Sequence, residues 1–195
     1  MDQFSKGRKI HPDFENPIDN IIINICEKLI KICQKYNITP NDITITRIIF
    51  GIFIIYKFKY SCNLYIPVFG TLIFYFLDCL DGNLARTTNQ VTVLGDYLDH
   101  FADIGYFGMV IIIMINKSYP NKYIILVTIS IFMYLSFIHL GLQQKKYNSK
   151  NNELLDNLNI FHTLKEENIV WTKYVGLGTF ISMIVFSIYY IQSFC

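Results

Sequence analysis

The chain has 195 residues, of which 52% are hydrophobic and only 16% are charged, and its formal net charge is +2. A soluble globular domain usually carries about 25% charged residues, so these proportions argue against an ordinary water-soluble enzyme. The mean hydropathy of +0.33 favours an integral membrane protein. The small net charge and the lack of a basic block give no reason to expect a nucleic-acid partner.

The first 36 residues form two segments, neither of which is predicted to span a membrane. Residues 1–17 are polar, lack the apolar core of a secretory signal, and predict an N-terminal tail. In residues 18–36, apolar residues recur every three or four positions and polar residues fill the opposite face. This spacing predicts an amphipathic helix that lies on the membrane surface or on a partner. The residues of its apolar face are Ile18, Ile21, Ile22, Ile25, Leu29, Ile32, Cys33 and Tyr36.

Five later segments are apolar over a length that can cross the roughly 30 Å of a bilayer's hydrocarbon core. They comprise residues 43–60, 64–84, 95–116, 122–142 and 173–194. The stretch 143–172 is polar, and we expect it to be partly helical or to contain a short sixth span. No internal repeat or low-complexity linker divides the chain. The predicted fold is therefore one all-α integral membrane domain over residues 1–195, with a transmembrane bundle of five or six helices in residues 41–195.

Basic residues are distributed unevenly about these spans. With the N-terminus in the cytoplasm, 13 of the 17 Lys and Arg residues lie on or near the inner side and four lie outside. The four outer residues are Lys57, Lys59, Lys117 and Lys122. Because positive residues favour the cytoplasmic side, we expect a cytoplasmic N-terminus, and five spans would place the C-terminus outside.

The five cysteines are odd in number and show no metal-binding spacing. They are Cys26, Cys33, Cys62, Cys79 and Cys195. We interpret them as small apolar residues of helix faces.

Aspartates are concentrated in the 26-residue window 78–103, which holds five of the 15 acidic residues. Asp78 and Asp81 are about one helical turn apart, and so are Asp99 and Asp103 on the next predicted helix. The short connection between these two helices makes them antiparallel neighbours. We therefore expect the four carboxylates to face one another near the inner membrane surface.

Four carboxylates at a membrane interface repel one another and are costly to desolvate unless cations neutralise them. A site with only oxygen ligands favours Mg²⁺, Mn²⁺ or Ca²⁺ over zinc, and two such ions could bridge a diphosphate. Gly82, Ala85 and Gly95 lack bulk and would leave room for a nucleotide, and Arg86 could neutralise phosphate charge. A proton relay or a structural hydrogen-bonded pair would explain two buried aspartates, but it explains four on two stripes less well.

The spacing of these residues resembles a known family motif. The pattern Asp-x2-Asp-Gly-x2-Ala-Arg-x8-Gly-x3-Asp-x3-Asp runs from Asp78 to Asp103 and matches, without a gap or a substitution, the motif of the CDP-alcohol phosphatidyltransferases. The segment with Asn41, Thr44 and Arg47 is similar to the family's opening span, where polar residues help to hold the donor nucleotide. The likeness is good over residues 18–142 and weaker beyond them.

The resemblance implies an integral membrane enzyme of phospholipid synthesis. Such an enzyme cleaves the diphosphate of a CDP-linked donor, releases CMP and joins the phosphoryl group to an alcohol acceptor. Mg²⁺ or Mn²⁺, with two ions bound, would be its cofactor, and the active site would lie on the cytoplasmic side. A homodimer is a further expectation of the same resemblance.

The resemblance also assigns roles to single residues. Asp78, Asp81 and Asp99 would ligate metal, and Asp103 would ligate metal or act as the general base for the attacking hydroxyl. The residues expected to contact the CDP group are Gly82, Ala85, Arg86, Gly95, Asn41, Thr44 and Arg47.

Two departures from the family pattern leave alternatives open. The family usually has six spans and we count five, so a non-catalytic member that binds nucleotide or lipid is a second interpretation. Residues 86–92, with 98–99 and 102–103, look like those of bacterial glycerophosphate-type transferases. Residues 94–96, followed by 99–100, look instead like those of choline/ethanolamine phosphotransferases. The short chain favours a compact user of CDP-diacylglycerol over a choline/ethanolamine-type enzyme with diacylglycerol as acceptor. A transporter is disfavoured, because the acids cluster toward one face of the membrane.

Overall fold

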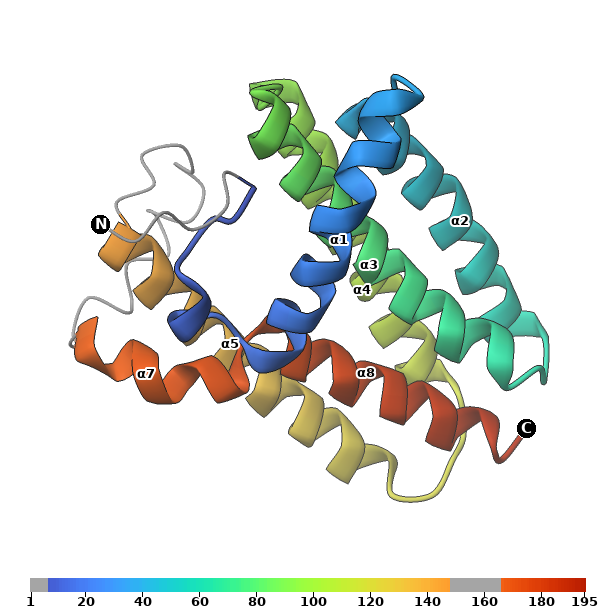
Figure 1. Cartoon of the computed structure of the whole chain (residues 1–195). Coiled ribbons are helices and arrows are strands. Elements are labelled where there is room, and N and C mark those ends of the chain that lie inside the picture. Colours follow the sequence, from blue (N-terminus) through green and yellow to red (C-terminus); the bar gives the residue numbers. More distant parts are fainter. Residues whose placement is uncertain (1–6, 148–165) are drawn as a thin grey trace.

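The computed structural model describes residues 7–147 and 166–195, and every regular element in these ranges is helical (Figure 1). Five long helices come first: α1 (Pro17–Lys35), α2 (Pro40–Tyr60), α3 (Tyr65–Thr88), α4 (Val93–Asn116) and α5 (Lys122–Tyr147). The short helix α7 (Ile169–Thr172) lies between two 3-10 turns, Glu166–Asn168 and Lys173–Val175, and α8 (Leu177–Gln192) follows. Another 3-10 turn, Pro12–Phe14, precedes α1. The prediction of an all-α membrane protein is confirmed.

Four stretches of the described chain are long and apolar enough to cross a membrane on their own. They are α3, α4, the part of α5 from Lys122 to Gln143, and the stretch from Ile169 to Gln192. The first predicted span, 43–60, lies in α2, which contains Arg47, Lys57 and Lys59 over this range. This helix is long and apolar enough to cross a membrane only when it is taken together with α1. The chain bends by 111° between α1 and α2, so the described residues contain four candidate spans, or five if this bent pair crosses as one. Of the stretch in which a sixth span was sought, residues 148–165 lie outside the described part of the chain.

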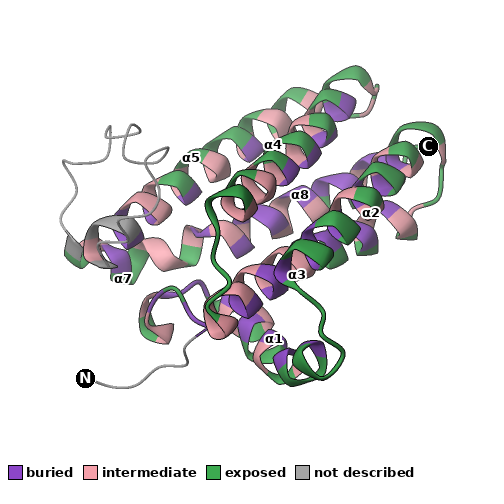
Figure 2. Cartoon of the chain, turned by 90° about the horizontal axis from the view of Figure 1, so that it is seen from above, coloured by how far each residue is buried: buried purple, intermediate pink, exposed green. Residues whose placement is uncertain are grey.

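The main core lies where α2, α3, α4, α5 and α8 meet. The Phe74 ring of α3 stacks on the Tyr106 ring of α4 with their centres 3.9 Å apart. Hydroxyl groups of Thr71 and Tyr106 share a buried hydrogen bond of 2.7 Å. Buried residues follow the inner faces of these helices and exposed residues follow the outer faces (Figure 2). The outer faces are rich in large apolar side chains, which fits contact with lipid and not with water.

Helix α1 lies across α3 (Figure 1). It packs through Ile23, Cys26, Ile30 and Cys33, all of which are buried. Of the predicted apolar face, Cys33 belongs to this stripe, and Ile22 and Leu29 are half-buried against the same core. The other predicted residues that remain exposed include Ile21, Ile25, Ile32 and Tyr36. The bundle therefore uses one stripe of α1 and leaves a second apolar stripe open, and its contact with the membrane surface stays a prediction.

The described part of the predicted N-terminal tail packs against the bundle. Arg8 is only 8% exposed and holds this segment to α1. Its Nε donates to Glu27 at 2.9 Å, its Nη1 to Asn20 at 2.7 Å and its Nη2 to Asn24 at 2.6 Å. These three contacts join residues 8 and 20–27 into one unit beside α3.

The interpretation of all five cysteines as unpaired apolar residues is wrong for two of them. Cys62, in the connection between α2 and α3, forms a disulfide with Cys195, which follows α8, and their Cα atoms are 5.3 Å apart. Cys26 and Cys33 are buried and Cys79 is partly buried, and all three are free, as expected. The pairing is invisible in the sequence, because the two partners are 133 positions apart.

Candidate active site

Three helices bring the predicted site residues to one end of the bundle. Helix α3 ends at Thr88, and the φ of 55° at the following Asn89 places it in the left-handed region that asparagine tolerates. Thr92 then caps α4, because its hydroxyl accepts a hydrogen bond of 3.0 Å from the backbone N–H of Gly95. The connection 89–92 thus reverses the chain, so the last turns of α3 and the first turns of α4 lie at the same end as the start of α2.

The guanidinium of Arg47 lies at the centre of three aspartates. Its Nη1 donates to Asp78 and, at 3.0 Å, to Oδ1 of Asp103, and its Nη2 donates to Oδ1 of Asp99 at 2.6 Å. The Arg47 side chain is completely buried and lies over the Phe74 ring, with its guanidinium carbon 5.0 Å from the ring centre. The repulsion between like-charged carboxylates is therefore offset by a cation of the protein itself. Although the sequence suggests Arg47 as a contact for CDP, its described contacts are with these aspartates.

The same aspartates suit a divalent cation. One carboxylate oxygen from each of Asp78, Asp99 and Asp103 lies within 4.8 Å of the other two. Oxygens bound to one octahedral Mg²⁺ lie about 3 to 4 Å apart, so a contraction of roughly 1 Å would let all three share an ion. The side chains of Asp99 and Asp103 are each 34% exposed, which leaves their carboxylates open to an ion or a substrate. Carboxylate-only donors fit Mg²⁺ and Mn²⁺, so the residues present fit the expected metals.

Asp81 stands apart from this group. It is 4% exposed, and its Oδ2 accepts a hydrogen bond of 2.7 Å from the hydroxyl of Thr44 on α2. The Thr44 hydroxyl also contacts the backbone carbonyl of Pro40 at 3.1 Å. The structure therefore brings together three of the four predicted metal ligands and places the fourth on Thr44.

Gly82 and Arg86 lie one helical turn apart on α3 and touch. A Cβ atom added to Gly82 would lie 3.2 Å from Nη1 of Arg86, so the guanidinium covers this glycine. The Nε of Arg86 donates at 2.7 Å to the backbone carbonyl of Gly7 in the N-terminal segment. Ala85, on the same helix, is half-buried. The N-terminal segment thus holds the arginine of the motif beside the small residues of the motif.

Gly95 lies close to Asn41, so α4 and α2 also meet beside the carboxylates. A Cβ atom added to Gly95 would lie 3.0 Å from the Thr92 hydroxyl and 3.4 Å from Oδ1 of Asn41. The exposed Asn41 side chain and the Gly95 backbone form one edge of the site. All of the residues that the sequence singles out on α2, α3 and α4 therefore gather at one end of the bundle.

The profile of the family described as CDP-alcohol phosphatidyltransferase matches residues 37–193, which is most of the chain. The chain belongs to the CDP-alcohol phosphatidyltransferase family. The match begins just before α2 and ends at the last turn of α8, so it contains every residue of the site except Gly7.

A curated relative is the archaetidylinositol phosphate synthase of Pyrococcus horikoshii. It is 33% identical to this chain over 95 residues, which cover 49% of this chain and 46% of the relative. The alignment thus spans about half the length of either protein. No solved structure matches the chain.

Gly7 lies outside both the family match and the motif, and the sequence did not predict its contact with Arg86. Gly7 fits so closely that an added Cβ would lie 1.8 Å from the amide oxygen of Asn83. The contact itself is made by a backbone carbonyl, which every residue possesses. The sequence therefore contains no feature from which the hydrogen bond between Arg86 and the Gly7 carbonyl could be predicted.

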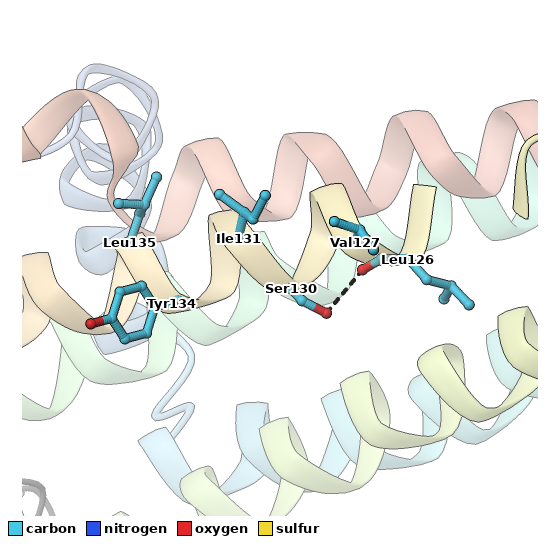
Figure 3. A pocket seen from close by; sticks show the side chains of 6 residues that line it. All are labelled: Leu126, Val127, Ser130, Ile131, Tyr134 and Leu135. Carbon is cyan, nitrogen blue, oxygen red and sulfur yellow. Dashed lines mark hydrogen bonds between the residues drawn. The ribbon is translucent and has the colours of Figure 1, made fainter. Parts of the chain in front are cut away.

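An open groove of about 400 Å³ lies along α5 (Figure 3). Its lining is mostly apolar and comes from α5: Leu126, Val127, Ser130, Ile131, Tyr134 and Leu135. The Ser130 hydroxyl donates to the backbone carbonyl of Leu126 at 2.9 Å, so it is satisfied within the helix. The groove contains none of the motif residues, and the chemistry is expected at the carboxylates instead.

Proposed function

We propose that the protein transfers a substituted phosphoryl group from a CDP-linked donor to an alcohol, with release of CMP, as a step of membrane phospholipid synthesis. The observation that carries this proposal is the juxtaposition of Asp78, Asp99 and Asp103, whose carboxylate oxygens lie within 4.8 Å of one another. A complete family motif and the family match support the same reaction. The name of the Pyrococcus relative, a synthase, supports the synthetic direction.

In the proposed reaction, the acceptor hydroxyl attacks the phosphorus that carries the donor's lipid or alcohol group. A new phosphorus–oxygen bond forms, the bond to the bridging oxygen of CMP breaks, and the hydroxyl proton moves to Asp103. Asp103 suits this role because its side chain is 34% exposed, whereas that of Asp78 is 16% exposed. Its 3.0 Å contact with Arg47 fixes the carboxylate in place. An alcohol is a weak acid on its own, so the hydroxyl must itself be made more acidic. Bound divalent cations would supply that acidification and would neutralise the diphosphate.

The four aspartates of the motif are the proposed ligands of two Mg²⁺ or Mn²⁺ ions. Asp78, Asp99 and Asp103 would share one ion after a small contraction, since one oxygen of each lies within 4.8 Å of the other two. Asp81 would join them by turning from the Thr44 hydroxyl, to which it is now bonded at 2.7 Å. The expected ligand set is therefore complete without histidine or cysteine, in keeping with hard cations.

The donor nucleotide is proposed to lie over the small residues beside the carboxylates. Gly82, Ala85 and Gly95 would leave room for it, with Asn41 at the edge of the pocket and the Arg86 guanidinium available for phosphate. Thr44 and Arg47 would act on the nucleotide through the aspartates that they touch.

CDP-diacylglycerol is the proposed donor, because the chain is compact and presents apolar helix faces to lipid. A choline/ethanolamine-type reaction would instead consume CDP-choline or CDP-ethanolamine and diacylglycerol. We propose that the carboxylate end faces the cytoplasm, since 13 of the 17 basic residues lie on that side of the predicted topology. A second copy of the chain is a further proposed partner, which a measurement of oligomeric mass in detergent would test.

The test is CMP release by the purified full-length protein across a panel of donors and acceptors, with Mg²⁺ or Mn²⁺ and with EDTA. Wild type should release CMP with at least one donor only when a divalent cation is present. Asp103→Asn should lower the rate by roughly 10²–10⁴-fold, the usual contribution of a general base, and more if metal is lost too. Asp13→Asn is the matched control, because Asp13 is exposed and lies far from the motif in sequence.

Two outcomes would contradict the proposal. Equal rates for wild type and Asp103→Asn across the whole panel would remove the carboxylates from the chemistry. Binding of CDP by the wild type without any turnover would instead favour the non-catalytic interpretation.

A further inference from the structure

The disulfide between Cys62 and Cys195 joins two segments at the end of the bundle that is farthest from the motif. Cys62 follows the last turn of α2 and Cys195 follows the last turn of α8. The C-terminus lies beside the connection between α2 and α3 (Figure 1). Asp78 lies 13 positions after Tyr65 along α3, a rise of about 20 Å, so the bond and the aspartates lie well apart along the bundle.

Polar contacts beside the disulfide bring the same two segments together without it. Gln192 is buried, with 4% of its surface exposed. Its Nε2 donates to the backbone carbonyls of Ser61 at 2.9 Å and Asn63 at 3.2 Å. Its Oε1 accepts a hydrogen bond of 2.8 Å from the ammonium group of Lys117 at the end of α4. The approach of the cysteines is therefore part of a built contact among three helix ends.

Paired and free cysteines are separated between the two ends. Cys79 is next to Asp78 in α3, and the buried Cys26 of α1 packs against the backbone carbonyl of Phe76 at 4.0 Å. Cys33 lies further along the same face of α1. In the described chain, the free thiols thus accompany the carboxylate end and the disulfide occupies the other end.

The crossing pattern agrees with this separation. Four stretches able to span the membrane lie between Cys62 and Cys195. An even number of crossings returns the chain to the side from which it started, so both cysteines lie on one side of the bilayer. Disulfides persist in oxidising compartments and are rare where glutathione keeps thiols reduced.

We propose that the Cys62–Cys195 disulfide forms in the cell, so that this end of the bundle faces an oxidising compartment while the carboxylates face the reducing one. In the step that forms it, the two thiols lose two protons and two electrons to the disulfide of a thiol–disulfide oxidoreductase, which becomes a dithiol. The inference goes beyond the proposed function and does not depend on it, because a catalytically silent protein would carry the same cross-link.

The first test counts thiols in the full-length protein inside its membrane. Cells are quenched in acid, the proteins are denatured, and free thiols are blocked with N-ethylmaleimide. The protein is then reduced and treated with a polyethylene-glycol maleimide, which shifts its mobility on a gel once for each new thiol. Wild type should show two shifts after reduction and none without it, since three of its five cysteines are free.

Cysteine variants make the assignment specific. Cys62→Ser should show no shift after reduction, because the remaining partner is already blocked. Cys33→Ser is the matched control and should keep both shifts. Blocking of all five wild-type cysteines at the quench would overturn the proposal, as would two shifts that persist in Cys62→Ser.

The second test assigns the side. Sealed vesicles of known orientation are treated with a membrane-impermeant phosphine and then with an impermeant maleimide. Labels should appear on Cys62 and Cys195 only when the reagents reach the face opposite the cytoplasm. Labelling from the cytoplasmic face alone would overturn the assignment of sides, whatever the enzyme activity of the same preparation.

Discussion

At the scale of single residues, Arg47 supplies positive charge to the carboxylate cluster. One completely buried guanidinium contacts Asp78, Asp99 and Asp103, which come from two other helices. Removing one partner of a buried ion pair leaves uncompensated charge and usually costs about 3–5 kcal/mol. A divalent cation would supply the same compensation, so Arg47 and the proposed metals act on the same carboxylates.

Arg47→Gln should therefore lower the melting temperature of the protein in EDTA. Added Mg²⁺ should raise the melting temperature of this variant more than it raises that of wild type. The melting temperature of Arg47→Lys in EDTA should lie between those of wild type and Arg47→Gln. Lysine keeps the charge but loses the planar guanidinium that reaches several carboxylates. Thermal unfolding in detergent, with and without Mg²⁺, measures both effects. Lys31→Gln, an exposed change on α1, is the control. Equal melting of Arg47→Gln and wild type in EDTA would contradict this account.

Thr44 has the corresponding role for Asp81. Thr44→Val keeps the side-chain shape but removes the 2.7 Å hydrogen bond to a buried carboxylate, and bonds to charged groups contribute about 1.5–3 kcal/mol. We expect the free energy of unfolding to fall by about that amount in denaturant titrations. Thr46→Val is the matched control two residues away, since the Thr46 hydroxyl is exposed and donates within its own helix to the carbonyl of Asp42. Equal free energies of unfolding for the two variants would show that the hydrogen bond from Thr44 to Asp81 does not stabilise the protein.

At the scale of the helices, α2 and α3 pack closely enough to need glycine. A Cβ atom added to Gly51 would lie 2.8 Å from Cε2 of Phe74, whose ring stacks on Tyr106 and supports Arg47. Small residues allow this close approach between membrane helices. The distance between α2 and α3 is thus coupled to the position of the guanidinium among the aspartates.

Gly51→Ala should destabilise the protein, because overpacking costs about 1–3 kcal/mol and exceeds the helix propensity that alanine adds. Gly108→Ala should be neutral or stabilising by up to about 1 kcal/mol, since nothing lies within 4 Å of its added Cβ. The difference between the two unfolding free energies is the measurement. A change of the same sign in both variants would show that α2 and α3 do not require glycine at position 51.

Arg8 attaches the N-terminal segment to the helices. Three side-chain hydrogen bonds join Arg8 to α1, and the neighbouring Gly7 carbonyl accepts from Arg86. Arg8→Ala should free the segment and raise the rate of tryptic cleavage after Lys9 on the order of tenfold or more, since each lost bond to a charged group contributes about 1.5–3 kcal/mol. Mass spectrometry of a cleavage time course measures the rate. Lys28→Ala on the exposed face of α1 should leave the rate unchanged; similar rates in both variants would show that Arg8 does not hold the segment.

At the scale of the whole molecule, the disulfide links elements that are far apart in sequence. Closing a loop of 133 residues stabilises a folded chain by at most about 5 kcal/mol in the chain-entropy description, and by less where inserted helices already restrict the unfolded state. Reduction should therefore lower the unfolding midpoint of wild type and of Cys33→Ser. Cys62→Ser should unfold at one midpoint with and without reductant. A wild-type midpoint that ignores the reductant would rule out a stabilising role for the bond.

Much of the site could be predicted because it depends on helical periodicity. Asp78 and Asp81, like Asp99 and Asp103, recur at spacings that share a helix face, and a short connection places the two helices at one end. The position of Arg47 could not be predicted in the same way. Its spacing within α2 is compatible with contact to a nucleotide or to acids, and only the packing of α2 against α3 and α4 chooses the acids.

The sequence also does not determine which face of α1 packs against the bundle. Isoleucines at three- and four-residue spacing predict an apolar helix, but the helix has two apolar stripes. The bundle buries Ile23, Cys26 and Ile30 and leaves Ile21 and Ile25 exposed. Periodicity identifies an apolar stripe, but it does not say whether protein or lipid covers it.

The sequence by itself determined the membrane class, the helical fold and the carboxylate motif, because composition and local periodicity are enough to specify them. Only the tertiary structure decided which cation holds the aspartates, that the N-terminal segment reaches Arg86, and that Cys62 meets Cys195. These contacts join residues 31 to 133 positions apart. Such partners are selected by how the helices pack, and the packing depends on all of their faces at once.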